Sequence, residues 1–236
     1  MPTLRAVLAG VVGVLLLVGV AQLTIGSSIA GTPVAAPPFP GPAAATSTLE
    51  PGRPQPPAPT VSPEARLDQL KAALLRPAEV GKGWRASPQQ PTPNASAPAV
   101  CGGTGVVARF PDAHRIGTAL QGESGDRLQQ TLSVFSDAAT AGSAFDAFAD
   151  GLDCAKGTLG GTAVSISDPE DVRSQVKGER ATSWTLSGEG FRAVLISVVA
   201  KDQLMNFVFL TPNGGDLTKL DALVLAKTGV ARLLNT

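Results

Sequence analysis

Proline is the residue that most limits where this chain can fold. Eleven of the 20 prolines fall between Pro33 and Pro63, and four more fall between Pro88 and Pro98. Each proline removes a backbone donor and fixes φ, so a segment this dense in proline does not propagate a helix or a sheet. We therefore interpret residues 31–61 as a proline-rich tether. The remaining residues, 62–236, are roughly 175 in number and suffice for one folded domain.

The first 30 residues have a different character. Residues 6–25 are almost continuously apolar, and after Arg5 the next charged residue is Glu50. A helix of twenty residues is about 30 Å long, the thickness of the hydrocarbon core of a bilayer. Positive charge before the apolar run orients such a helix with its short N-terminus in the cytoplasm. The pattern predicts a membrane-directing helix within residues 1–30 and an extracytoplasmic tether and domain.

Two interpretations of this helix remain open. It can be an uncleaved signal anchor, which would hold the protein in the cell membrane as a single-pass chain. It can also be a signal peptide cleaved at the small-x-small site Ser28-Ile29-Ala30, in which case the protein is secreted. No cysteine follows the apolar run, so no lipid anchor is predicted.

Composition excludes several kinds of partner and cofactor. The formal net charge is zero, with 19 basic and 19 acidic residues and no basic block, so nucleic acid is not an expected partner. One histidine and two cysteines do not supply the four ligands of a structural zinc site. The glycines of residues 102–105 lack both the Walker lysine and the Rossmann spacing. We expect neither a metal nor a cofactor.

The apolar spacing after the tether predicts an α+β domain. We expect a single antiparallel sheet of about five or six strands with flanking helices. A hairpin is predicted over 117–124 and 127–135, turning at Gly125-Asp126, and short connections make the later strands antiparallel neighbours. The predicted strands after the hairpin are 162–167, 181–187, 191–200 and 204–210.

Three amphipathic helices are predicted beside this sheet. The first begins at Ser62, with Pro63 at the first helical position; the second covers 138–152 behind an Asp137 N-cap; the third runs from about 216 to 234. The apolar faces expected for the first and third helices are Leu67, Leu70, Leu74 and Leu75, and Leu217, Leu220, Val224 and Leu233.

Strands 191–200 and 204–210 are apolar at both odd and even positions. An antiparallel strand with one solvated face alternates polar and apolar residues, so these two strands are expected to be covered on both faces. The simpler explanation is a central strand pair with helices on each side. The alternative is that one face lines an apolar ligand cleft, with Met205, Phe207 and Phe209 as the candidate ligand-binding residues.

The two cysteines predict one structural disulfide. Cys101 precedes the expected hairpin, and Cys154 follows the helix after it. An exported domain with two cysteines favours a bridge over two free thiols, and the absence of a CxxC motif argues against a redox role.

No convincing catalytic set is visible, so the protein is not expected to be an enzyme. His114 is the only histidine, with Asp112 nearby. A Ser-His-Asp triad is defined by geometry, and the sequence provides none. We interpret His114 as an exposed loop residue; a secreted hydrolase that uses it is the least favoured of the functions considered.

In the order of its motifs, the chain resembles the actinobacterial extracytoplasmic sensor domain of PknH-type serine/threonine kinases. The resemblance covers about residues 64–234. It is carried by the segment LLRPAEVG at 74–81, by Cys101, and by VFSDAATA at 134–141 followed by Phe145 and Cys154. It implies an antiparallel sheet with flanking helices and a cleft for an envelope-derived ligand. The kinase version has two disulfides, whereas this chain allows one.

Two functions from different classes follow from these observations. The first is a non-enzymatic ligand-binding or sensor-like domain, tethered at the cell envelope, for an unknown envelope ligand. The alternative is an interaction or assembly factor that meets an envelope protein. No sequence feature separates the two.

Overall fold

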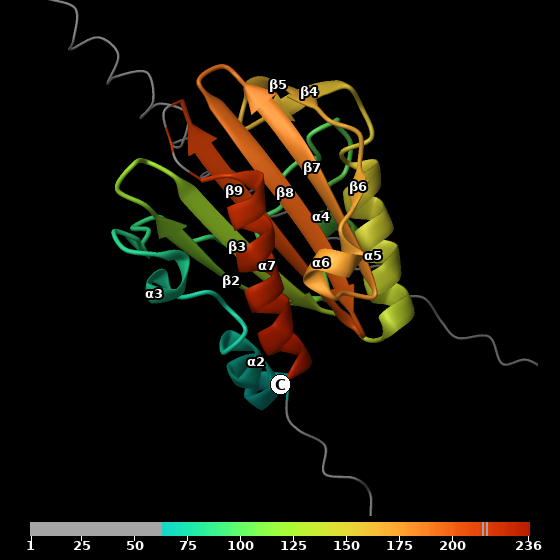
Figure 1. Ribbon diagram of the computed structural model, residues 1–236. Helices are drawn as coiled ribbons and strands as arrows, with labels where there is room; N and C mark the ends of the chain where they lie inside the picture. The colour runs from blue at the N-terminus through green and yellow to red at the C-terminus, as the bar shows by residue number, and fades with distance from the viewer. Residues whose placement is uncertain (1–62, 214, 216) are drawn as a thin grey trace, which may run out of the picture.

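The computed structural model describes residues 63–213, 215 and 217–236 (Figure 1). The predicted membrane-directing helix, the tether and the Ser62 cap lie outside the described residues. Within the described part of the chain, no helix is both long enough and apolar enough to cross a bilayer.

The described residues build one antiparallel sheet in the order β1-β2-β3-β9-β8-β7-β5-β4, with β6 paired beside β7. The fold class is confirmed, but the described sheet has nine strands instead of five or six. The strands are β1 (Arg85–Ala86), β2 (His114–Gln121), β3 (Arg127–Val134), β4 (Lys156–Leu159), β5 (Thr162–Ile166), β6 (Glu170–Asp171), β7 (Arg180–Gly188), β8 (Phe191–Ala200) and β9 (Gln203–Pro212).

The difference in strand number has a simple physical cause. The six longer strands correspond to the six predicted from apolar runs. The three additional strands, β1, β4 and β6, have two to four residues each and no buried side chain. Such segments carry no periodic pattern, because they are strands only through the backbone pairing that a neighbour offers.

Six helices are found among the described residues, and the two longest cover opposite faces of the sheet (Figure 1). The helix α7 lies across the front of β8 and β9 in the view of Figure 1, with α6 beside it, and α5 packs on the other face of the same two strands. The helices are α2 (Pro63–Lys71), α3 (Pro77–Val80), α4 (Val106–Arg109), α5 (Ala138–Asp150), α6 (Arg173–Val176) and α7 (Lys219–Leu234).

Strand β8 is buried on both faces, as its sequence predicts, whereas β9 is buried on the α7 face and, beyond Leu204, only half-buried on the other. In β8, Val194, Ile196 and Val198 belong to the core cluster under α7, whereas the alternate residues Leu195 and Val199 belong to clusters with residues of α5. The simpler explanation, a central strand pair between helices, is the one the fold adopts.

The helix α5 begins where the sequence predicts. The Asp137 carboxylate accepts a hydrogen bond from the Thr140 backbone N–H at 2.7 Å, which caps the helix. This backbone bond, with hydroxyl donors from Ser136 and Thr140, holds the pKa of Asp137 below its usual value. Farther along the helix, the Arg180 guanidinium lies 4.2 Å from the centre of the Phe145 ring and pairs with Asp146, which fastens α5 to β7.

The predicted apolar face of the last helix is partly wrong. Leu217 and Leu233 are buried, but Leu220 is 70% exposed and Val224 is 56% exposed. The face of α7 that meets the sheet includes the small residues Ala222, Ala226 and Gly229, together with Leu225, Val230 and Leu233. Small residues let the helix approach the sheet closely. A prediction based only on large apolar side chains therefore identifies the wrong face of α7 as the buried one.

The first helix is also shorter than its leucine spacing suggests. The helix α2 ends at Lys71, so Leu74 and Leu75 lie beyond it and not on its apolar face. Leu75 is nevertheless buried, because its side chain packs in the core cluster under α7, and its backbone N–H donates to the Gln130 side chain at 2.7 Å.

The contact between α7 and the sheet can be tested at Gly229. A Cβ at this position would lie 2.9 Å from Phe207 Cζ and 3.2 Å from Gln130 Nε2. We expect Gly229→Ala to lower the free energy of unfolding, because overpacking costs about 1–3 kcal/mol and outweighs the gain in helix propensity of about 1 kcal/mol. The matched control is Gly142→Ala in α5, where the added Cβ meets nothing within 4 Å and should stabilise. Urea unfolding of both variants measures the difference; equal effects would contradict close packing at Gly229.

Candidate functional site

An open hollow lies between α3 and the first turns of α7, and it is closed on a third side by the β2–β3 turn. Figure 1 shows α3 and this turn on the same side of α7. We call it the α3–α7 hollow. Its volume is about 470 Å³, within the range of small-molecule sites. Its lining residues are Glu79, Val80, Lys82, Trp84, Glu123, Ser124, Asp126, Leu217, Asp221, Val224 and Leu225.

One wall of the hollow is aromatic. A Cβ on Gly122 would lie 3.1 Å from Trp84 Cε2, so the indole packs directly on the backbone of the β2–β3 turn. The Glu123 carboxyl group lies in the same way over Gly83, where an added Cβ would be 3.0 Å from it. These two contacts join the segment after α3 to the β2–β3 turn and hold Trp84 in place.

The opposite wall is the start of α7, which a capping box fixes. The Thr218 hydroxyl accepts a bond from the Asp221 N–H at 3.2 Å, and the Asp221 carboxylate accepts from the Thr218 N–H at 2.9 Å. Bonds from the Thr218 hydroxyl and backbone hold the pKa of Asp221 below its usual value. Asp221 therefore keeps its negative charge under mildly acidic conditions.

An ion pair joins α3 to the last turn of α7. Arg232 Nη1 of α7 donates to Glu79 Oε2 of α3 at 2.8 Å and to the Leu74 carbonyl at 3.3 Å. The same Glu79 carboxylate accepts from the Arg76 N–H at 2.8 Å, which closes the start of α3. The charge of Glu79 is thus paired with that of Arg232.

The candidate ligand-binding residues Met205, Phe207 and Phe209 are all 0% exposed. They belong to the core cluster that α7 covers, and Phe207 and Phe209 stack with ring centres 6.0 Å apart. Neither hollow described on the domain includes them in its lining. In this conformation they form the floor on which α7 rests.

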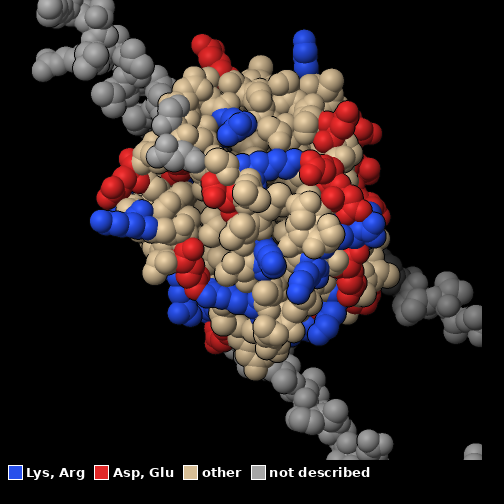
Figure 2. All heavy atoms as spheres, viewed as in Figure 1, with Lys and Arg blue, Asp and Glu red and all other residues tan. Residues whose placement is uncertain are grey.

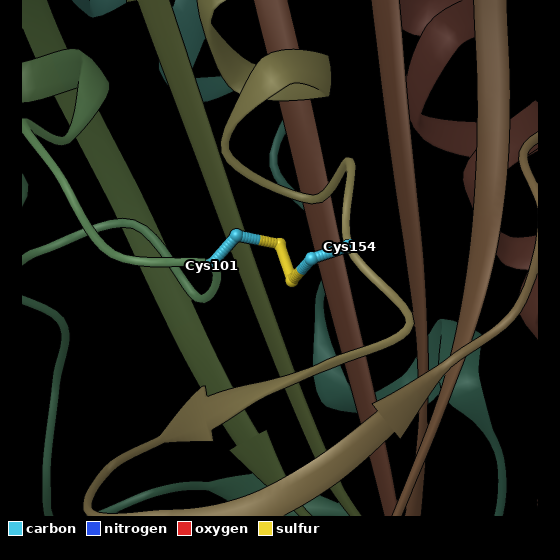
Figure 3. The surroundings of a disulfide bond; sticks show 2 residues. All are labelled: Cys101 and Cys154. Atoms are coloured by element: carbon cyan, nitrogen blue, oxygen red, sulfur yellow. A yellow bond between two sulfur atoms is a disulfide. The ribbon is translucent and has the colours of Figure 1, made fainter.

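The predicted disulfide between Cys101 and Cys154 is present (Figure 3). The two side chains meet from separate loops: Cys101 lies before α4, and Cys154 follows the end of α5. The Cys101 N–H also donates to the Gly151 carbonyl at 3.0 Å, and the Thr158 N–H donates to the Val100 carbonyl at 2.9 Å. The bridge therefore fixes a loop against the end of α5 and against β4, away from the residues that line the α3–α7 hollow.

His114 is exposed at the start of β2 and does not line either described hollow. Among the described residues, no group of three His, Cys, Asp or Glu side chains is arranged to hold a metal ion. A second hollow, of about 140 Å³, lies between α2, the end of α7 and the β8–β9 turn. Arg66 in its lining is already paired with Asp202 at 2.6 Å.

Sequence reasoning missed the residues of the α3–α7 hollow. They come from three segments far apart in the chain, and no periodic pattern connects them. A usable signal was Trp84, the one tryptophan outside the predicted strands, which directly follows the break at 77–83. The glycines of the β2–β3 turn were a second signal of this hollow, because the absence of a side chain at Gly122 leaves room for the Trp84 indole.

The fold is similar to that of a solved extracellular domain. It matches the extracellular domain of PknH from Mycobacterium tuberculosis with a TM-score of 0.56 and 15% sequence identity, over 72% of this chain and 96% of that domain. No protein-family model and no curated protein matches the chain. The resemblance drawn from the order of motifs is therefore confirmed at the level of the fold.

Proposed function

We propose that this protein is a non-enzymatic, extracytoplasmic ligand-binding domain of the sensor type, tethered at the cell envelope by its N-terminal segment. The fold likeness to an extracellular domain supports the compartment, as does the disulfide, which persists in oxidising environments. The anchor and the tether remain predictions from the sequence.

The observation that carries the proposal is the α3–α7 hollow. Its lining combines the Trp84 indole and four aliphatic side chains with six polar or charged ones, so it can contact both the apolar and the polar parts of a small molecule. Its two walls belong to different parts of the chain that a single ion pair joins, Glu79 with Arg232. A ligand bound between α3 and α7 would contact both helices and strengthen the contact between them. Binding would therefore change how firmly α3 is held against α7.

A second function is favoured by the outer face of α7. Leu220 and Leu234 are large apolar residues of this helix that are exposed and do not line the α3–α7 hollow. Figure 2 shows the surface over α7 as largely uncharged, with scattered basic side chains. Exposed apolar surface of this kind often marks a protein interface, so an interaction or assembly role in the envelope is the alternative.

One pair of variants separates the two functions. Val224 lines the hollow and Leu220 does not, although both are exposed on α7. We expect Val224→Trp to fill part of the hollow and to abolish retention of a small molecule from an envelope extract, while Leu220→Trp retains it. The measurement is mass spectrometry of the molecules that stay bound to the purified full-length chain.

The reverse pattern identifies the alternative. If Leu220→Trp loses a specific protein neighbour in photo-cross-linking while Val224→Trp keeps it, the protein is an interaction factor. If both variants retain the same small molecules as the wild-type chain, the hollow is not the binding site.

A further inference from the structure

We propose that the end of the domain where the tether enters rests on an anionic lipid surface, with a lipid headgroup in the smaller hollow. This inference goes beyond the proposed function, of which it uses only the attachment of the chain to a membrane. Four observations carry it: the place where the tether joins the domain, three lysines that form no ion pair, an exposed leucine, and a buried amide that lines the hollow.

The smaller hollow lies at the end of the domain that the tether joins. We call it the α2–α7 hollow, because α2, the end of α7 and the β8–β9 turn line it. Figure 1 shows α2 beside the C-terminal end of α7. The helix α2 begins at Pro63, and Arg66, less than one turn later, lines the hollow and pairs with Asp202 of the β8–β9 turn. The chain from the predicted anchor therefore reaches the domain within about one helical turn of this hollow.

Three exposed lysines lie around the α2–α7 hollow, and none of them forms an ion pair with another described residue. Lys201 lines the hollow. Lys227 lies on the outer side of α7, seven residues and so about two turns before Leu234. Lys177 follows α6 in a segment held beside the β8–β9 turn, because the Lys201 N–H donates to Glu179 Oε1 at 3.0 Å.

The balance of charge at this end is positive. The three lysines and Arg66 lie beside the carboxylates of Glu179 and Asp202, while Asp68 and Lys71 of α2 pair with each other. Figure 2 shows basic side chains around the lower part of α7, with fewer acidic ones among them. An anionic bilayer attracts each lysine that comes within about a Debye length of its surface. The sign of the charge therefore favours contact with anionic headgroups.

The hollow provides an apolar rim and a polar floor. Leu234 is 42% exposed and lines the hollow, so contact with lipid would remove apolar surface from water. Gln203 also lines it and is only 8% exposed; its side chain shares the α7 face of β9 with Met205, two residues later. Within the described part of the chain, the Gln203 side-chain amide makes no hydrogen bond. A headgroup oxygen or hydroxyl in the hollow would supply the missing partner.

The size of the hollow suits a headgroup better than a whole ligand. Its volume is about 140 Å³, below the range of drug-sized sites but several times the volume of one water molecule. A small phosphate-bearing group can enter it while the rest of the lipid stays in the bilayer. This is the arrangement expected if the domain lies on the membrane surface.

The contact can be followed in the full-length chain held in nanodiscs. A cysteine introduced at Ala231, exposed on α7 between Lys227 and Leu234, carries a nitrobenzoxadiazole label. The matched label site is Ser143, exposed on α5 on the opposite face of the sheet. Lipids with a nitroxide on the headgroup quench a label that lies at the bilayer surface. The two nanodisc compositions are phosphatidylcholine alone and phosphatidylcholine with added phosphatidylglycerol.

We expect quenching of the label at 231 in the nanodiscs that contain phosphatidylglycerol, and little in phosphatidylcholine alone. The label at 143 should not be quenched in either. Added salt should release the contact, because exposed charges carry it. Lys201→Gln and Lys227→Gln should each lower the ratio of docked to free domain by roughly fivefold. Lys156→Gln, on the exposed edge strand β4, should leave the ratio unchanged.

The buried amide is tested by Gln203→Leu. This variant should weaken docking without altering its salt dependence, since it removes a hydrogen-bonding group and no charge. It should also unfold in urea at the same concentration as the wild-type chain, because no internal hydrogen bond is lost. Wild-type docking in Gln203→Leu would remove the headgroup from the hollow and overturn that part of the inference.

Several outcomes would overturn the inference as a whole. These are equal quenching at 231 in neutral and anionic nanodiscs, no quenching in either, or unchanged quenching in Lys201→Gln and Lys227→Gln. Self-quenching between two labelled chains in one nanodisc, in either lipid, would identify a second copy of the chain as the occupant. A chain that does not stay in the nanodisc is tested by flotation with vesicles of the same two compositions, where binding to neutral vesicles or to neither kind overturns the inference.

Discussion

Removal of the disulfide is expected to lower the free energy of unfolding by about 4 kcal/mol. The variant is the double substitution Cys101→Ala with Cys154→Ala, which opens a loop whose ends are 53 residues apart in the sequence. The bridge restricts the unfolded chain, and for a loop of this length the lost entropy corresponds to that free energy. Urea unfolding, followed by the fluorescence of the two tryptophans, measures the change.

Reduction provides the control for this variant. A reducing agent should destabilise the wild-type protein by the same amount and leave the double variant unaffected. The amide of Thr158 should also exchange faster in the variant, since its bond to the Val100 carbonyl lies beside the bridge. The loop-entropy account requires that the bridge stabilises the fold by restricting the unfolded chain. A loss of stability below about 1 kcal/mol would contradict that account.

The sequence was informative where apolar patterns are long. The two-sided apolar character of 191–200 and 204–210 predicted the central pair β8 and β9, and the Asp137 cap placed the start of α5. The disulfide between Cys101 and Cys154 was predicted from the expected export of the domain to an oxidising compartment. These features depend on local chemistry or on burial of many side chains, and both can be read from a single chain.

The sequence was less informative where contacts between distant segments decide the structure. The buried face of α7 depends on how closely Gly229 approaches Phe207, which the helix pattern does not contain. Likewise, Trp84 becomes part of a hollow only because Gly122, in a turn almost 40 residues later, leaves room for its ring. Met205, Phe207 and Phe209 look like a ligand surface in the sequence because burial by one's own helix and burial by a ligand require the same residues.

The second large effect is expected at Gln130, a polar side chain that is 0% exposed in β3. Its Oε1 accepts from the Leu75 N–H at 2.7 Å, and its Nε2 donates to the Ala73 carbonyl at 3.2 Å. Gln130→Leu keeps a similar volume but leaves both backbone groups buried without this partner. Each such group costs about 1–3 kcal/mol, so we expect a loss of about 2–5 kcal/mol in urea unfolding.

Gln129→Leu is the matched control, because Gln129 is exposed on the opposite face of the same strand and its replacement should change stability by less than about 0.5 kcal/mol. The two variants also differ in what they should do to function. The segment that Gln130 holds, at Ala73 and Leu75, leads directly into α3 and Trp84. Gln130→Leu should therefore speed amide exchange at Leu75. It should also lower the affinity of the α3–α7 hollow for any ligand in the absence of urea, while Gln129→Leu should do neither. A Gln130→Leu protein with wild-type stability and wild-type exchange at Leu75 would show that α3 is positioned by its clamp to Arg232 alone.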